Sequence, residues 1–325
     1  MSVSAIDEIN DWLPWKLLND TTEPACNWLY TGDKSFTEPF FDDTISICRR
    51  MENNCKSFKP VSSLSLMSEW ANAADALSPT AIIFHVSRCG STLLSQLLSL
   101  DENNLALSEV PFFDDILRLP FKNKTYNNLM AARFLKAAVT LYGRKKTGNE
   151  KHLFIKTDSW HIHFYESLRS LYPVVPFIFL YRNPWEVVLS QRRQRGMHAV
   201  PGVIEPAIFG FSNQQINLHD LDYYMTKVLE GYFNKLIEIV QADKQVLLVN
   251  YNEGLDNIFS KMYALLGLEI DVKMRSQLTQ RTLFHAKHPH RLFKEENREE
   301  KAPTYLSPVL DLYNQLDVIR LTTFR

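Results

Sequence analysis

From residue 79 onward, short apolar runs alternate with longer stretches in which apolar and polar positions recur at helical spacing. The runs are partly β-branched, which predicts buried strands at 81–86, 153–155, 176–181 and 246–249, with a shorter segment at 105–107. The stretches between them predict helices at 91–100, 127–142, 161–171 and 220–241, and one that starts at Pro184. This alternation predicts βαβ units, a parallel sheet and sites at the carboxyl ends of its strands.

The first 78 residues contain no strand-turn-helix unit and are rich in Trp, Phe and Asp. We expect residues 1–78 to form an accessory region, mostly helical from about Phe40 onward, that packs on a core domain at 79–325. The predicted fold class is therefore α/β. It is a three-layer sandwich around a central parallel sheet, with a mostly helical accessory region at the N-terminus.

Beyond the last predicted strand, the sequence indicates an amphipathic helix and then a basic segment. The helix ends at Gly267, a suitable C-cap, and its apolar face carries Ile258, Met262, Leu265 and Leu266. Residues 281–301 are basic, with glutamates in their second half, and include His285, Lys287, His290 and Arg291. Two interpretations stay open: a solvated loop of mixed charge, or a mobile basic flap over an anionic ligand.

Composition limits the classes of partner. Of 325 residues, 45% are apolar, which supports a well-packed core, and the formal net charge is -1. A chain so close to neutral has no general attraction for nucleic acid or anionic membranes, so any anion site must be local. No run approaches the roughly 18 apolar residues of a membrane span, and the N-terminus does not resemble a signal peptide. We expect a soluble cytoplasmic protein.

The four cysteines lie without C-x-x-C spacing, at Cys26, Cys48, Cys55 and Cys89. This pattern argues against a zinc site or a disulfide framework, and no metal is expected. Cys89 lies in the most informative turn of the chain, where we interpret it as a small packing residue.

That turn joins the predicted strand 81–86 to the predicted helix 91–100. Backbone N–H groups and the positive end of a helix dipole would point above Gly90, where a glycine allows close approach of an anion. A triphosphatase loop, G-x-x-x-x-G-K-[ST], would need Gly where this chain has His85 and Lys where it has Ser91. Arg88 supplies the positive charge instead. The alternative interpretation is an ordinary strand-to-helix connection.

A second basic constellation follows the strand 176–181. Arg182 sits at the strand tip, and Ser190 lies about two helical turns further on. More positive charge follows at Arg192, Arg193 and Arg195. Two basic strand tips suit a ligand with two separated phosphates, which arginine can bind in a bidentate fork. The alternative for the arginine run is a solvated helix face.

Together the two segments resemble a known family. S-R-C-G-S-T-L-L at 87–94 is similar to the 5′-phosphosulfate loop P-R-S-G-T-T-L-L of sulfotransferases that use 3′-phosphoadenosine 5′-phosphosulfate (PAPS). Y-R-N-P-W-E-V-V-L-S at 181–190 is similar to their 3′-phosphate motif Y-R-N-P-x-[DE]-x-x-x-S. V-N-Y-N-E-G-L at 249–255 resembles the R-Y-E-D-L segment of bacterial members. The resemblance covers roughly 81–268 and implies a P-loop NTPase-like fold.

The resemblance also implies site residues. The 5′-phosphosulfate would be held by the loop residues Arg88, Cys89, Gly90, Ser91 and Thr92, and the 3′-phosphate by Arg182 and Ser190. Three features depart from the family: Ser87 replaces Pro, Cys89 replaces Ser, and the C-terminal G-x-x-G-x-x-K segment of cytosolic members is missing. The basic flap is a candidate substitute for that segment.

Two carboxylates compete for the role of general base. Glu109 follows the predicted phosphate-loop helix at a spacing that resembles that of the catalytic Glu in tyrosylprotein sulfotransferases. Asp158 falls where cytosolic enzymes have the His of K-T-H, with Lys156 at the Lys position. A base should be partly desolvated or placed against Lys156, and we favour Glu109.

Each carboxylate also has a structural interpretation. Glu109 could cap a helix before Pro111, and Asp158 could be the N-cap of the helix that contains His161 and His163. These histidines are two positions apart and share no helical face, which argues against a metal pair.

The predicted function is sulfuryl transfer from PAPS to a hydroxyl or amine of a small-molecule or glycan acceptor. Arg88 and the amides of residues 90–92 would grip the phosphosulfate, Lys156 would neutralise the leaving phosphate, and Glu109 or Asp158 would deprotonate the acceptor. One alternative is a kinase-like phosphotransferase using ATP and magnesium, with Asp158 positioning the ion. Another is a non-catalytic binding module. Residues 196–204 are the predicted acceptor wall or lid, and they do not identify the acceptor.

Overall fold

The computed structural model describes residues 9–19, 23–212, 220–282, 284–285, 288–292 and 301–323. The chain divides into two compact units. The first contains Met1–Ala81, Ser95–Lys156 and Glu166–Pro173. The second contains Ile82–Leu94, Thr157–Tyr165 and Val174–Arg325. Within the described part of the chain, no helix combines the length and apolar character needed to cross a membrane.

The central sheet has five parallel strands in the order β5-β6-β4-β7-β8, flanked by helices. Its strands are β4 Pro79–His85, β5 Asn104–Ser108, β6 His152–Lys156, β7 Phe177–Tyr181 and β8 Val246–Asn250. The three strands β5, β7 and β8 are buried along their whole length, as expected of strands covered on both faces. The predicted α/β class and the position of each strand are confirmed.

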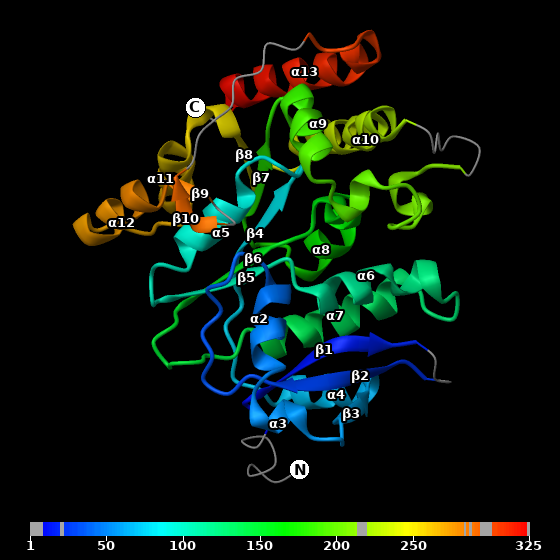
Figure 1. The fold of residues 1–325 in the computed structure, drawn as a ribbon, viewed down its shortest axis with the longest axis vertical. Helices are drawn as coiled ribbons and strands as arrows, with labels where there is room; N and C mark the ends of the chain where they lie inside the picture. Colours follow the sequence, from blue (N-terminus) through cyan, green and yellow to red (C-terminus); the bar gives the residue numbers. More distant parts are fainter. Residues whose placement is uncertain are drawn as a thin grey trace. The chain divides into compact units, whose positions relative to one another are not determined.

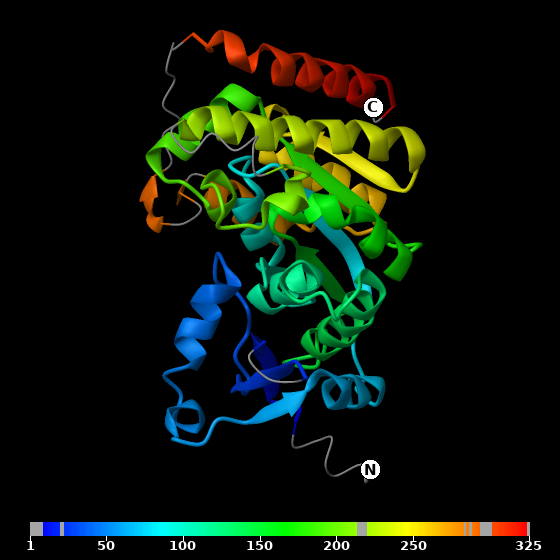
Figure 2. The ribbon, with the colours of Figure 1, turned by 90° about the vertical axis from the view of Figure 1, so that its right-hand side faces the viewer.

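The second unit contains the first turn of α5 Ser91–Leu98, and the rest of that helix belongs to the first unit. It also contains α9 Pro184–Arg193, α10 Leu221–Ala242, α11 Leu255–Leu265, α12 Val272–Thr282 and α13 Ser307–Thr323. Short 3₁₀ segments lie at Ser159–Phe164 (η1), Met197–Ala199 (η2), Pro206–Phe209 (η3), Tyr251–Glu253 (η5) and Thr304–Leu306 (η6). Figure 2 shows α13 running beside α10, and the two helices are in contact. The sequence did not predict α12 or α13.

The predicted basic flap at 281–301 lies partly outside the described residues. Its described backbone includes the end of α12 and an antiparallel pair, β9 Phe284–His285 and β10 His288–Leu292. Lys287 and the side chains of His285, His290 and Arg291 are outside the described part of the structure. The flap interpretation therefore stays a prediction.

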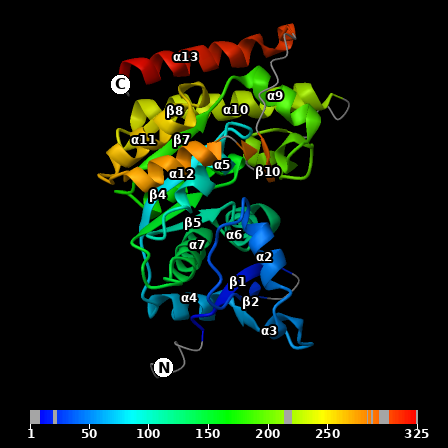
Figure 3. The ribbon, with the colours of Figure 1, turned by 60° about the vertical axis from the view of Figure 1, so that its left-hand side comes forward.

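The first unit holds the N-terminal region. Helices appear from residue 41 onward, as predicted: α2 Phe41–Cys48, α3 Glu52–Cys55 and α4 Leu64–Asn72. The sequence did not predict the three-stranded antiparallel sheet of β1 Trp12–Leu18, β2 Ala25–Tyr30 and β3 Val61–Ser63. Pro14 explains the omission, because it interrupts the strand pattern and the β1–β2 register shifts between Pro14 and Lys16. Figure 3 shows β1 and β2 side by side.

This unit also contains α6 Pro111–Lys122 and α7 Asn128–Tyr142, and β1 contacts both of them (Figure 1). Helix α6 was not predicted, because Pro111 and Pro120 punctuate its sequence. Side chains at and just after the end of α7 form hydrogen bonds with β1 and the residues before it. The Tyr142 hydroxyl donates to the Pro14 carbonyl at 2.6 Å, and the buried Arg144 guanidinium donates to the carbonyls of Ile9 and Trp12.

The packed aromatic rings of β4 and β7 give a first prediction. Phe84 on β4 is fully buried, with ring centroids 5.3 Å from Phe177 and 4.9 Å from Phe179. Replacing Phe84 by Ala should lower the free energy of unfolding by about 3–5 kcal/mol, because the lost ring leaves a cavity. Urea denaturation measures this change.

Phe58 provides the matched control, because its side chain is 80% exposed. Phe58→Ala should change the free energy of unfolding by no more than about 0.5 kcal/mol. Similar losses in both variants would contradict the assigned core.

Candidate functional site

The loop between β4 and α5 has an unusual backbone. Ser87, Arg88 and Gly90 have φ angles of 71°, 52° and 81°. Glycine adopts this left-handed region freely, but each non-glycine residue there costs about 1–3 kcal/mol. Where residues with positive φ alternate with residues with negative φ, successive backbone N–H groups point into one concavity, which can bind an anion. Because α5 begins at Ser91, its free N–H groups face the same loop.

Two buried side chains hold this strained loop. His85 Nδ1 accepts a hydrogen bond from the Ser87 amide at 3.0 Å, so its Nε2 carries the proton and donates to the Thr157 carbonyl at 3.0 Å. Gln191, which is fully buried, donates from Nε2 to Ser87 Oγ at 3.0 Å. Ser87 is therefore held through both its backbone and its side chain. The polar His85 in an otherwise apolar strand was the only sequence signal for this role.

Gln191 also connects the loop to the predicted acceptor wall at 196–204. Its carbonyl oxygen accepts from the Gly196 amide at 2.8 Å, and its Nε2 lies 3.2 Å from His198 Nε2. His198 is buried, and a side chain on Gly196 would collide with the imidazole ring at 2.9 Å. The side-chain amide of Gln191 therefore bonds both to Ser87 and to Gly196, the first residue of the predicted wall.

The two predicted anion loops meet at Tyr251. A Cβ atom on Gly90 would lie 2.8 Å from Tyr251 Cε2, so the ring packs directly on the glycine. The Arg182 guanidinium carbon lies 4.3 Å from the centroid of the same ring, a cation–π contact. Arg182 Nη1 donates to the Arg88 carbonyl at 3.3 Å. The fold therefore brings together residues that are 94 positions apart.

Sequence reasoning did not single out Tyr251 as a site residue. Its position within the segment 249–255 was the available signal.

Arg182 has a second partner. Its Nε donates to Glu186 Oε2 at 2.5 Å, one helical turn along α9. The Glu186 side chain is 41% exposed, against 17% for Arg182. A pair this exposed on one side contributes only about 0–1 kcal/mol. An incoming phosphate can therefore displace the carboxylate at little cost.

The arginines further along are partly committed to structural ion pairs. Arg192 Nε and Arg195 Nη2 bind Asp222 on α10 at 2.5 and 2.7 Å. Burial raises the pKa of Asp222, but the hydrogen bonds from Arg195 and Arg192 outweigh this and lower it overall. Arg192 also lies 4.9 Å from the Trp185 ring. Asp222 on α10 thus neutralises much of the positive charge that the sequence places near Ser190.

The remaining loop residues differ in exposure. Cys89 is fully buried, and its thiol donates to the Leu180 carbonyl at 3.4 Å. Its side chain is therefore a packing group, and only its backbone can face an anion. Ser91 is buried, whereas Thr92 and Ser190 are half-buried.

In the first unit, Glu109 and Lys156 form a close ion pair. Lys156 Nζ lies 2.5 Å from Glu109 Oε1, and the Glu109 amide donates to the Lys156 carbonyl at 2.8 Å. The Lys156 side chain is 1% exposed and that of Glu109 is 20% exposed, so the carboxylate is the more accessible partner. Helix α6 has Val110 as its N-cap, and Glu109 has a strained φ of 51°. Such outliers gather at functional sites.

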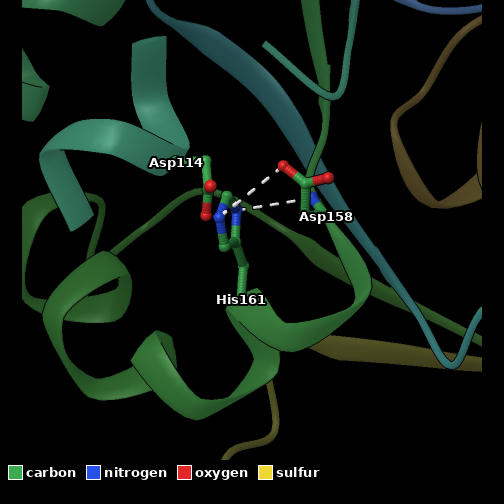
Figure 4. Close-up of side chains that lie close together, drawn as sticks. All are labelled: Asp114, Asp158 and His161. Carbon is green, nitrogen blue, oxygen red and sulfur yellow. Dashed lines mark hydrogen bonds and ion pairs between the residues drawn. The ribbon is translucent and has the colours of Figure 1, made fainter. Parts of the chain in front are cut away.

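Asp158 has the helix-capping role that its position also suggested. It is buried and is the N-cap of η1, where it forms a capping box with His161. The Asp158 amide donates to His161 Nδ1 at 3.3 Å, and His161 Nε2 lies 3.7 Å from Asp158 Oδ2 (Figure 4). The contacts of Asp158 within its unit are therefore those of an N-cap.

No family model and no curated protein matches this sequence. Solved structures are similar at low identity. A sulfotransferase domain from the curacin biosynthetic pathway is 12% identical, with a TM-score of 0.43, covering 76% of this chain and 98% of its own. A sulfotransferase from Mycobacterium avium is 13% identical, with a TM-score of 0.44, covering 87% and 83%. A sulfotransferase from Alicyclobacillus acidocaldarius is 16% identical, with a TM-score of 0.39, covering 62% and 90%.

The contact between Gly90 and Tyr251 gives a second prediction. Gly90→Ala should lower the free energy of unfolding by about 1–2 kcal/mol for the left-handed backbone, and by a further 1–3 kcal/mol, roughly, for the collision with the ring. Thermal and urea unfolding measure the sum.

Gly202→Ala is the matched control, because Gly202 has a similar φ of 80° and no described neighbour within 4 Å of the place that a methyl group would take. It should show the backbone cost alone. If both variants lose the same free energy, the Tyr251 ring does not confine Gly90.

Proposed function

We propose that this protein is a sulfotransferase that moves a sulfuryl group from PAPS to a hydroxyl or amine of a small-molecule or glycan acceptor. One observation carries the proposal: two basic loops, at 87–92 and 182–190, converge on the ring of Tyr251. A ligand that spans both loops needs two separated anionic groups. PAPS has them, at its 5′-phosphosulfate and its 3′-phosphate.

In this proposal the strained loop holds the 5′ end. The backbone N–H groups of residues 89–92 and the Arg88 guanidinium would bind the phosphosulfate, and Arg182 and Ser190 would bind the 3′-phosphate. Ser91 stands where a triphosphatase has the Lys that reaches the β- and γ-phosphates. A donor without those phosphates fits this loop better than a nucleoside triphosphate does.

Glu109 is the proposed general base. The acceptor oxygen or nitrogen loses its proton to the Glu109 carboxylate and forms a bond to sulfur, while the bond from sulfur to the bridging phosphate oxygen breaks. The products are the sulfated acceptor and 3′-phosphoadenosine 5′-phosphate. Lys156 holds the carboxylate and, with Arg88, would stabilise the negative charge that develops on the leaving phosphate. Support comes from the ion pair itself, in which the Glu109 carboxylate is the more accessible partner, and from the strained φ of 51° at Glu109.

The kinase-like alternative would need Asp158 to position magnesium. Within the second unit, Asp158 forms a capping box with His161, which is a structural role. The loop also has no Lys for a γ-phosphate.

Arg182→Ala tests the two-point clamp. The variant should bind 3′-phosphoadenosine 5′-phosphate about ten- to a hundred-fold more weakly, since a hydrogen-bonded ion pair is lost, whereas binding of adenosine 5′-phosphate should be unchanged. Isothermal titration calorimetry measures both affinities. Arg275→Ala, which removes an exposed arginine on α12, is the charge-matched control. Equal losses for both nucleotides would reject the clamp.

Substitution of the two carboxylates distinguishes their roles. Glu109→Gln should lower kcat by about a hundred-fold or more, with nucleotide affinity unchanged, because the amide cannot accept the proton. Asp158→Asn should instead reduce the melting temperature, by weakening the N-cap, and leave most of kcat. A sulfate-transfer assay across an acceptor panel supplies kcat. A larger kcat loss in Asp158→Asn would reverse the assignment.

A further inference from the structure

The C-terminal helix α13 carries a carboxylate that reaches the ends of two strands. Asp317 Oδ1 accepts hydrogen bonds from the Tyr181 hydroxyl at 2.5 Å, from Asn250 Nδ2 at 2.9 Å and from Arg320 Nε at 2.9 Å. Tyr181 and Asn250 are buried and face each other as partners in the parallel pair of β7 and β8. One oxygen atom therefore ties the last residues of both strands together.

These two residues immediately precede the pair at the centre of the proposed site. Tyr181 is followed by Arg182, and Asn250 by Tyr251. The Arg182 guanidinium lies over the Tyr251 ring, and that ring packs on Gly90. A shift of either strand end would move the cation, the ring or both. The hydrogen bonds of Asp317 thus act one residue away from the contact that joins the two anion loops.

More polar groups complete this network. The Asn250 side chain also donates to the Tyr313 hydroxyl at 3.0 Å, and Arg320 Nε lies 3.1 Å from the Tyr181 hydroxyl. Arg320 reaches Glu253 at 3.2 Å, and Glu253 accepts from the Asn250 amide at 2.8 Å. The network is partly buried, since the Asp317 side chain is 26% exposed. Polar groups that satisfy one another in this way favour one geometry, and loss of a member takes a partner from the others. The network can therefore hold the strand ends in register.

We propose that Asp317 is a positioning residue, which sets the aim of Arg182 and Tyr251 and thereby the preference for a nucleotide with a 3′-phosphate. This inference rests on the proposed function. It assigns a role to a helix beyond residue 268, where the motif resemblance stops. Asp317 hydrogen-bonds Tyr181 and Asn250, which directly precede Arg182 and Tyr251, and it acts on the site through these two residues.

The test compares Asp317→Ala and Asp317→Asn in the full chain by calorimetry, with 3′-phosphoadenosine 5′-phosphate and adenosine 5′-phosphate as ligands. Asp317→Ala should bind the first nucleotide at least about ten-fold more weakly and the second within about two-fold of wild type. Asp317→Asn keeps an oxygen that can accept from Tyr181, and it should recover most of the preference. Asp311→Ala, an exposed site on the same helix, is the matched control.

The outcomes separate the two proposals. If the wild-type protein does not prefer the nucleotide with the 3′-phosphate, the proposed function fails. If wild type shows the preference and Asp317→Ala keeps it, the positioning role is rejected. Equal weakening for both nucleotides, with a lower melting temperature, would make α13 a structural element only. Should Asp317→Ala fail to fold, loss of the preference in folded Tyr181→Phe, which removes one donor to Asp317, supports the role, and retention rejects it.

Discussion

The second unit depends on a loop between β4 and α5 whose backbone conformation costs free energy for the residues that adopt it. Ser87 and Arg88 take positive φ angles, and neither is a glycine. Two hydrogen bonds of Ser87 hold this loop in place: its amide donates to His85, and its hydroxyl oxygen accepts from Gln191. The strained, left-handed turn presents its backbone N–H groups to one side, which an ordinary strand-to-helix connection does not do. An anion at this loop therefore meets donors that need no rearrangement.

The same constraint extends to the rest of the unit through Tyr251. Its ring leaves room only for a glycine at position 90 and lies under the Arg182 guanidinium. Helix α13 then fixes the strand ends behind Arg182 and Tyr251 through Asp317. Packing, cation–π attraction and a partly buried polar network thus all contribute to the placement of the Arg182 guanidinium near the loop.

Much of the fold could be predicted from the sequence where local patterns were strong. Short, continuous apolar runs marked the five strands of the sheet, because a strand buried on both faces needs them. Where prolines interrupted the pattern, at Pro14 in β1 and Pro111 and Pro120 in α6, the elements were missed. Tertiary contacts stabilise those elements against their local preferences. Helix α13 is held partly by polar contacts from Asp317 and Arg320, which apolar periodicity cannot reveal.

The sequence by itself determined the positions and order of the two segments predicted to bind anions, because strand, turn and helix N-terminus are local features that spacing reveals. Tertiary structure alone decided which of the neighbouring cations are committed elsewhere, as when Asp222 pairs with Arg192 and Arg195. It also gave different partners to the two carboxylates that sequence left as rivals, placing Glu109 against Lys156 and Asp158 in a capping box. The physical reason is that the role of a charge depends on its partners, and those partners come from distant parts of the chain.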